Sequence, residues 1–249
     1  MTSMDLFCIL AGFAVGSFII TALGRLGSDT SVTSGPSACD QCSAQLSWYS
    51  LIPVMSFLAQ SGKCRACHGP ISPKYPFAEL AGGSIGLLSA VYAPDETVLV
   101  SSLFGWILLA LCLHDWMTYR LPDVLTLSLA LLGGVTTWLF FQPSWPDHLI
   151  GGAAGYMSFR LIESLYLGLK GRHGLGRGDT KLFGAIGIWI GWAGLAPALL
   201  IASTSALCHV LIESLASRSG LKSTHQIPFG PWLGLGGFIV WLWQISQLA

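Results

Sequence analysis

The chain of 249 residues is 53% hydrophobic and only 10% charged, and its mean hydropathy is +0.65, whereas soluble domains carry about 25% charged residues. This composition excludes an ordinary soluble domain and predicts an all-α polytopic membrane protein. Twelve Lys and Arg residues balance twelve Asp and Glu residues, so the net charge indicates no acidic partner. The sequence contains no long basic block, which argues against nucleic acid binding.

The apolar runs predict about eight transmembrane helices. A span needs about 20 residues to cross a hydrocarbon core of ~30 Å. Runs of this length lie near residues 4–24, 97–114, 121–141, 148–169 and 228–248. Residues 79–93 are short for a span, so we expect them to cross a locally thinned bilayer or to follow a re-entrant path. Residues 182–217 are too long for one crossing, and "GWAG" at 191–194 predicts a turn between two.

The distribution of charge predicts the orientation of these spans. With eight spans and the N-terminus outside, every Lys and Arg except Arg160 falls in a cytoplasmic loop, as the positive-inside rule expects. A single crossing through 182–217 would instead place Arg218 and Lys222 outside. The first apolar run follows no Lys or Arg and precedes no clean A-x-A site, so we interpret it as a retained span and not as a signal peptide.

The longest loop, residues 25–78, carries four cysteines in two C-x2-C knuckles: Cys39, Cys42, Cys64 and Cys67. Four thiolates suit tetrahedral Zn²⁺ and leave no open position for a substrate, so we expect a structural zinc-binding domain. Two disulfides are the alternative, but structural disulfides are rare in the reducing cytoplasm. His68 could also replace one thiolate. Because the loop has little apolar core, we expect it to fold only with its metal.

Carboxylates at membrane depth are candidates for function, because burying an ionisable group in a bilayer costs several kcal/mol. Arg160 and Glu163 lie three residues apart on one predicted helix, which favours a structural ion pair. Asp123 follows Pro122 and precedes an apolar run, which is typical of an N-cap or first-turn acid. These three residues therefore have structural explanations.

Asp115 and Asp179 have no such structural explanation. Asp115 lies near the predicted C-terminus of a helix, where the macrodipole disfavours negative charge, and Asp179 lies where a glycine-rich loop enters the next helix, where the macrodipole favours it. Both are predicted at the cytoplasmic edge of the membrane. A pair sharing one proton, with Asp115 the protonated member and Asp179 the base, could activate water on a peptide carbonyl. Gly176 and Gly178 would let a substrate backbone approach.

Several segments together resemble the bacterial prepilin peptidases, or type IV leader peptidases, which are intramembrane aspartyl proteases with a G-x-G-D motif. The segments are "GSF" (16–18), "LSWYSLIPVMSFLAQSGKC" (46–64), "ISPKYPFAEL" (71–80), "LPDVLTL" (121–127), "GLGRGDTKLFGAIGIWIGW" (174–192) and "IPFGP" (227–231). The resemblance covers nearly the whole chain and includes both cysteine knuckles. It implies three parts: a first helix at 1–24, the zinc-binding domain at 25–78 and the protease domain at 79–249.

The resemblance also implies an activity. It makes Asp115 and Asp179 the catalytic residues of an enzyme of the bacterial inner membrane, which removes the leader of type IV prepilins or type II secretion pseudopilins at the cytoplasmic face. Many members also methylate the new N-terminus with S-adenosylmethionine, whose binding residues the sequence does not identify. Ile20 stands where the family usually has asparagine, which puts the methyl transfer in doubt.

Two other functions use the same aspartates. A presenilin-like intramembrane protease has the same two-aspartate chemistry, but those proteins lack a C-x2-C domain, and their first aspartate follows tyrosine where Asp115 follows His114. A proton-coupled transporter would use the aspartates as relay sites, which lie more naturally in the middle of the bilayer.

Overall fold

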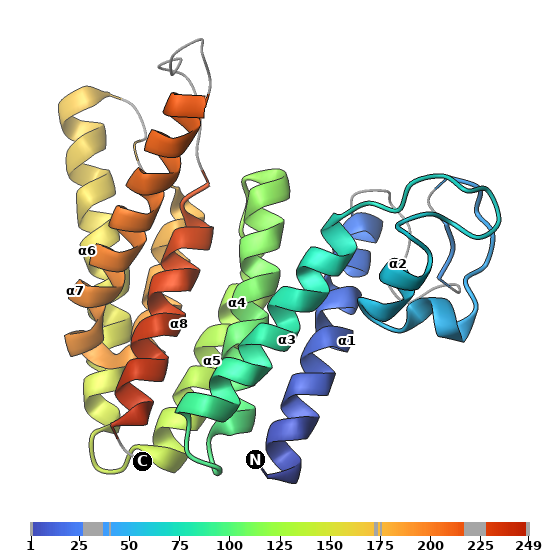
Figure 1. The fold of residues 1–249 in the computed structure, drawn as a ribbon. Helices are drawn as coiled ribbons and strands as arrows, with labels where there is room; N and C mark the ends of the chain where they lie inside the picture. The colour runs from blue at the N-terminus through green and yellow to red at the C-terminus, as the bar shows by residue number, and fades with distance from the viewer. Residues whose placement is uncertain are drawn as a thin grey trace. The chain divides into compact units, whose positions relative to one another are not determined.

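The computed structural model describes residues 2–26, 37–39, 41–171, 174, 176–216 and 228–247. These residues form helices, with two isolated β-bridges and no extended strand among them (Figure 1), so the all-α prediction is confirmed. The helices are α1 (Ser3–Leu26), η1 (Trp48–Leu51), α2 (Met55–Ala59), α3 (Lys74–Tyr92), α4 (Val98–Thr118), α5 (Asp123–Phe140), α6 (Trp145–Lys170), α7 (Arg177–Ala216) and α8 (Gly230–Ser246). The chain divides into two compact units, Met1–Trp106 and Ile107–Ala249.

Every predicted span coincides with a described helix. By length and apolar composition, four helices within the described ranges can cross a membrane: Ser3–Arg25, Val98–Thr118, Asp123–Phe140 and Arg177–Ala216. These helices establish the membrane character of the chain, whereas the number of eight spans stays a prediction. Arg172, Arg218 and Lys222, which contributed to the predicted orientation, lie outside the described residues.

In the first unit, α1 packs along α3 through small residues. A Cβ atom added at Gly12 would overlap the carbonyl oxygen of Gly82, and one at Gly16 would overlap that of Ala78. Glycines four residues apart let membrane helices approach this closely. The contact requires glycine at both positions of α1.

The re-entrant alternative for residues 79–93 is wrong, whereas their crossing of the membrane stays a prediction. Helix α3 starts at Lys74 and continues without a break for 19 residues, which is about 28 Å at 1.5 Å per residue. Hydropathy does not detect this start, because the first five residues of the helix, "KYPFA", are less apolar than the run that follows them. Pro76 lies in the first helical turn, where a missing backbone N–H breaks no intrahelical hydrogen bond.

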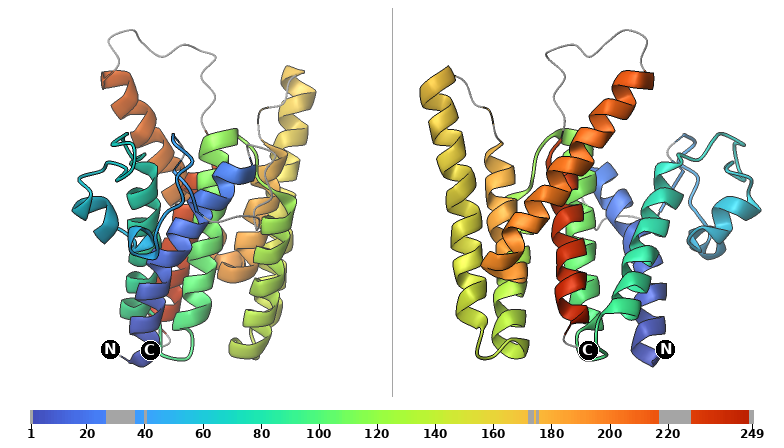
Figure 2. Two further views of the ribbon diagram at one scale, coloured as in Figure 1. Left: turned by 90° about the vertical axis from the view of Figure 1, so that its right-hand side faces the viewer. Right: turned by 60° about the vertical axis from the view of Figure 1, so that its left-hand side comes forward.

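In the second unit, α7 packs against α5, α6 and α8. Its 40 residues are interrupted at Gly191, whose φ of 65° and ψ of 175° are not helical. Figure 2 shows α7, in orange, as two segments that meet at an angle. The turn predicted at 191–194 is therefore present, and a single glycine in the left-handed region forms it.

A buried tryptophan fixes the first half of α7 against α5. The indole Nε1–H of Trp189 donates a 2.9 Å hydrogen bond to the carbonyl oxygen of Leu129. The same ring packs edge-on against Trp241 of α8, with 5.1 Å between the ring centroids. Trp189 thereby joins the three helices, and α7 carries Asp179 in its first turn.

Candidate functional site

Asp115 lies in the last turn of α4, and its side chain is buried, with 5% exposed. The backbone N–H of Gly230 donates a 3.1 Å hydrogen bond to its Oδ2. Gly230 is the first residue of α8, and Pro231 follows it. A free N–H at a helix N-terminus stabilises a carboxylate, which offsets the unfavourable dipole of α4.

Asp179 is the third residue of α7 and is half-buried. Gly176 precedes the helix, and its backbone hydrogen-bonds to the Asp179 carboxylate. An acid at the third helical position that bonds back to the residue before the helix is the arrangement of a capping box. Asp115 and Asp179 belong to the same compact unit, and they are near enough for a Coulombic interaction between their carboxyl groups.

The two predicted glycines have close neighbours within this unit. A Cβ atom added at Gly178 would lie 3.0 Å from the Cβ of Leu121, in the segment that leads into α5. One added at Gly176 would lie 2.8 Å from Oδ2 of Asp179. Gly178 thus permits the approach of the segment before α5, and Gly176 leaves room for the carboxylate. Gly176 is exposed.

An ion pair joins the first turns of α5 and α7. Asp123 is the first residue of α5, as predicted for a first-turn acid, and its Oδ1 lies 2.6 Å from Nζ of Lys181. These residues also border a largely apolar groove of about 430 Å³ between α5, α6 and α7, into which Leu127 and Ile188 contribute side chains. The pairing was not predicted, because nothing in the sequence relates two charges this far apart in the chain.

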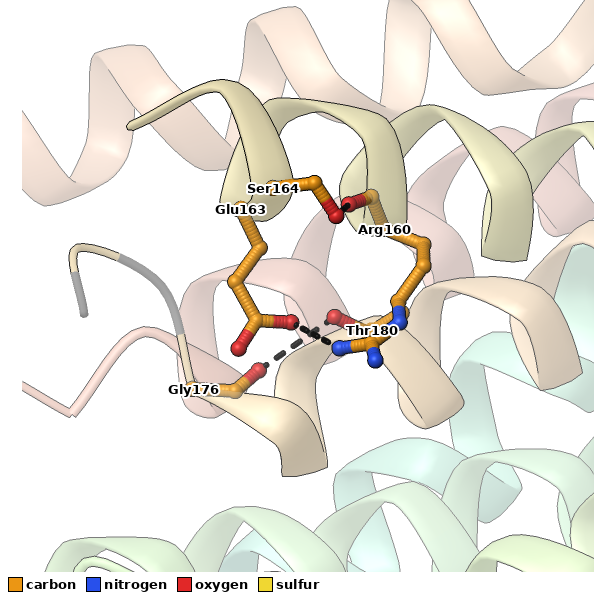
Figure 3. A network of polar contacts seen from close by, with 5 residues as sticks. All are labelled: Arg160, Glu163, Ser164, Gly176 and Thr180. Atoms are coloured by element: carbon orange, nitrogen blue, oxygen red, sulfur yellow. Dashed lines mark hydrogen bonds and ion pairs between the residues drawn. The ribbon is translucent and has the colours of Figure 1, made fainter. Parts of the chain in front are cut away.

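A smaller cleft of about 270 Å³ lies between α6 and the start of α7, where Glu163, Arg177 and Lys181 are among its lining residues. Figure 3 shows the polar contacts around it. The predicted pair is confirmed: Nη1 of Arg160 lies 2.7 Å from Oε2 of Glu163, whose side chain is 3% exposed. On α7, the hydroxyl of Thr180 donates a 3.4 Å hydrogen bond to the carbonyl oxygen of Gly176. The first turn of α7, which contains Asp179, therefore borders this cleft through Arg177 and Thr180.

In the first unit, the four predicted cysteines form one cluster. The Sγ atoms of Cys39, Cys42, Cys64 and Cys67 all lie within 4.8 Å of one another. Tetrahedral zinc with Zn–S bonds of about 2.3 Å separates its sulfurs by about 3.8 Å, so a small contraction suffices. The donor set fits Zn²⁺, and the two C-x2-C knuckles come together as one four-cysteine cluster that could hold this ion.

The two knuckles have the same local structure. Cys39 N–H donates to the carbonyl oxygen of Ala44 at 2.9 Å, and Cys64 N–H donates to that of Gly69 at 2.8 Å. Backbone hydrogen bonds from Cys67 and Ala66 lower the pKa of the Cys64 thiol to about 7, which favours the thiolate that binds a metal. The repeated turn aims both sulfurs of each knuckle at one point.

Comparisons with known proteins agree on one family. Residues 10–93 match the family described as the bacterial peptidase A24 N-terminal domain, and residues 102–211 match the type IV leader peptidase family. The comparison with solved structures found no match.

Relatives from several bacteria carry the name prepilin leader peptidase/N-methyltransferase. The protein from Burkholderia pseudomallei is 34% identical, over 95% of this chain and 84% of its own length. The protein from Klebsiella pneumoniae is 35% identical, over 80% of this chain and 91% of its own length. The protein from Dickeya chrysanthemi is 37% identical, over 81% of this chain and 71% of its own length.

Proposed function

This chain belongs to the type IV leader peptidase family, and on that premise we propose that it is a membrane aspartyl endopeptidase. Its substrates are type IV prepilins or type II secretion pseudopilins, from which it removes the leader peptide. The observation that carries the proposal is that Asp115 and Asp179, at the ends of different helices in one compact unit, are near enough for a Coulombic interaction between their carboxyl groups. An aspartic protease requires two carboxyl groups that share one proton.

The chemistry follows from that shared proton. One carboxylate of the pair, in its ionised form, removes a proton from water while the water oxygen bonds to the scissile carbonyl carbon. The other carboxyl group, which is protonated, donates its proton to the leaving nitrogen as the C–N bond breaks. The Gly230 N–H holds the Asp115 carboxyl in place. The exposed Gly176 leaves one side of Asp179 open to a substrate backbone, whereas Gly178 packs against Leu121.

The proposed place of cleavage is the cytoplasmic face of a bacterial inner membrane, with the N-terminus outside. Asp115 lies one turn before the end of α4, and Asp179 lies in the first turn of α7. Each is therefore near one end of a spanning helix. Arg120, Arg177 and Lys181 accompany them in the sequence, and cations of this kind favour the cytoplasmic side.

We assign the four-cysteine cluster a structural Zn²⁺ within a domain of residues 25–78, between the helix at 1–24 and the protease domain at 79–249. The four sulfurs would complete the coordination of the ion, so it would stabilise the fold and take no part in hydrolysis. The separation of the cluster from Asp115 and Asp179 in the sequence accords with that division of roles.

The name of the relatives also supports methylation of the new N-terminus, for which S-adenosylmethionine would supply the methyl group. Ile20, at the position where the family usually has asparagine, is an apolar residue buried in α1 with 5% exposed. If that asparagine has a polar task in methyl transfer, Ile20 does not perform it. We therefore propose peptidase activity as the primary function and methylation as its second step.

Co-expression with a prepilin tests the proposal. The native chain is expected to convert the prepilin to a shorter form, and Asp115→Asn or Asp179→Asn is expected to abolish the conversion. Asp123→Asn is the matched control, because this exposed acid belongs to a surface ion pair. Mass spectrometry of the product reports the cleavage position and any added methyl group. Normal cleavage by Asp179→Asn would refute the two-aspartate mechanism.

A further inference from the structure

The zinc-binding lobe, which comprises residues 37–39 and 41–71, carries an apolar surface outside the membrane-spanning helices. Between the two knuckles, the segment from η1 through α2 exposes six large apolar side chains: Trp48, Tyr49, Leu51, Ile52, Met55 and Leu58. We call this set the lobe patch. Trp48 is 78% exposed, Met55 66% and Leu58 65%, and so many exposed apolar side chains within eleven residues are typical of a segment that contacts a membrane or another molecule.

The buried carboxylate of Glu79 determines where along α1 and α3 the lobe patch lies. Oε1 of Glu79 accepts a 2.7 Å hydrogen bond from the hydroxyl of Ser17 on α1. Its Oε2 accepts a 2.7 Å hydrogen bond from the backbone N–H of Val54, in the turn between η1 and α2. Glu79 is itself buried, with 7% exposed. One side chain thus ties α1, α3 and the lobe together.

On α1, that level lies inside the apolar span Ser3–Arg25. Ser17 precedes Arg25, the last residue of the apolar span of α1, by eight residues, which is about 12 Å of helix. Glu79 follows Lys74, the first residue of α3, by five residues, which is about 8 Å. Figures 1 and 2 show that much of the lobe, including α2, lies beside the C-terminal part of α1 and the N-terminal part of α3.

The chemistry of the lobe patch matches the boundary between headgroups and acyl chains. Tryptophan and tyrosine concentrate at this boundary, where a ring can be apolar on one side and hydrated on the other. The Arg65 guanidinium lies 4.8 Å from the centroid of the Tyr49 ring, so a cation borders the patch where lipid phosphates would lie. Interfacial segments bury apolar side chains about 5–10 Å into this layer, which is of the same order as the distance of Ser17 from the end of the α1 span.

We propose that the lobe patch inserts into the cytoplasmic leaflet, so that the zinc-binding lobe is an interfacial membrane element and not a domain surrounded by water. Glu79 holds the segment at that depth. The metal cluster joins the stretch of chain before the segment to the stretch after it. The occupant of the patch is lipid, with anionic phosphate beside Arg65. This inference does not depend on the proposed peptidase activity.

Photo-crosslinking of the full chain in vesicles tests this inference. Benzoylphenylalanine replaces Trp48 or, in a second variant, Leu58, and the protein is reconstituted in phosphatidylethanolamine and phosphatidylglycerol vesicles. The matched control carries the same group at Gln45, an exposed polar residue of the first knuckle. A metal content equal to that of the native chain identifies the variants whose lobe is folded.

Irradiation is expected to produce lipid adducts at positions 48 and 58, which mass spectrometry detects. At position 45 the amount of lipid adduct is expected to stay at background. Adducts of positions 48 and 58 with polypeptide in place of lipid would overturn the proposal, because a protein surface would then cover the patch. Absence of lipid adducts at both positions in a variant with native metal content would overturn it as well.

Discussion

The backbone N–H of Gly230 and Oδ2 of Asp115 are joined by a 3.1 Å hydrogen bond that connects the first turn of α8 to the last turn of α4. A Cβ atom at Gly230 would lie 2.7 Å from Oδ2 and 3.2 Å from Cγ of Asp115. Gly230→Ala should therefore displace the carboxyl group, and we expect prepilin cleavage to slow at least about tenfold, which corresponds to about 1.4 kcal/mol of activation free energy.

The control for this prediction is Gly134→Ala in α5, where an added Cβ would meet nothing within 4 Å. Alanine is a better helix former than glycine, so this variant should cleave at the native rate. Equal rates for the two variants, measured as first-order conversion of prepilin, would show that the position of the Asp115 carboxyl does not depend on Gly230.

Removing the ion pair between Lys181 and Asp123 should have little effect. The two side chains are 45% and 72% exposed, and exposed pairs typically contribute about 0–1 kcal/mol to stability. We expect Lys181→Gln to change the midpoint of thermal unfolding by only a few degrees and cleavage by less than about threefold. A loss as complete as that of Asp179→Asn would assign Lys181 a direct part in the reaction.

The pair formed by Arg160 and Glu163 should behave differently, because Glu163 is almost fully buried. Arg160→Gln leaves the carboxylate without this cation, and breaking a buried pair from one side costs about 3–5 kcal/mol. We expect the double variant Arg160→Gln with Glu163→Gln to be more stable than Arg160→Gln alone. A double-mutant cycle of unfolding free energies in detergent measures the coupling, and additive effects would contradict it.

The zinc assignment predicts that replacing a clustered cysteine removes the bound metal and that replacing a single cysteine does not. Cys64→Ser should reduce bound zinc from one equivalent per chain to none and should make residues 37–71 sensitive to protease, because the lobe depends on the ion for its fold. Cys208→Ser is the matched control, since Cys208 is an exposed single thiol on α7. Elemental analysis checks both variants, and full zinc content in Cys64→Ser would contradict the assignment of all four cysteines as ligands.

The positions of the helices and the identity of the metal donors were predictable because local patterns determine them. Apolar runs indicate helices in a bilayer, where the backbone must satisfy its own hydrogen bonds, and C-x2-C spacing gives each knuckle two sulfurs. Local patterns failed at residues 79–93, where the apolar run is shorter than the helix. Polar residues can continue a helix beyond the hydrocarbon core, and hydropathy does not detect them.

The sequence by itself determined an all-α membrane protein, a cluster of four cysteines and two aspartates with no structural explanation at helix ends. Only the tertiary structure decided their partners. The contact of Gly230 with Asp115, the pair formed by Lys181 and Asp123, and the clamp of Glu79 on Ser17 and Val54 join residues far apart in the chain. Such contacts depend on how closely helices approach and in which register, and packing sets both through small residues spread over several helices.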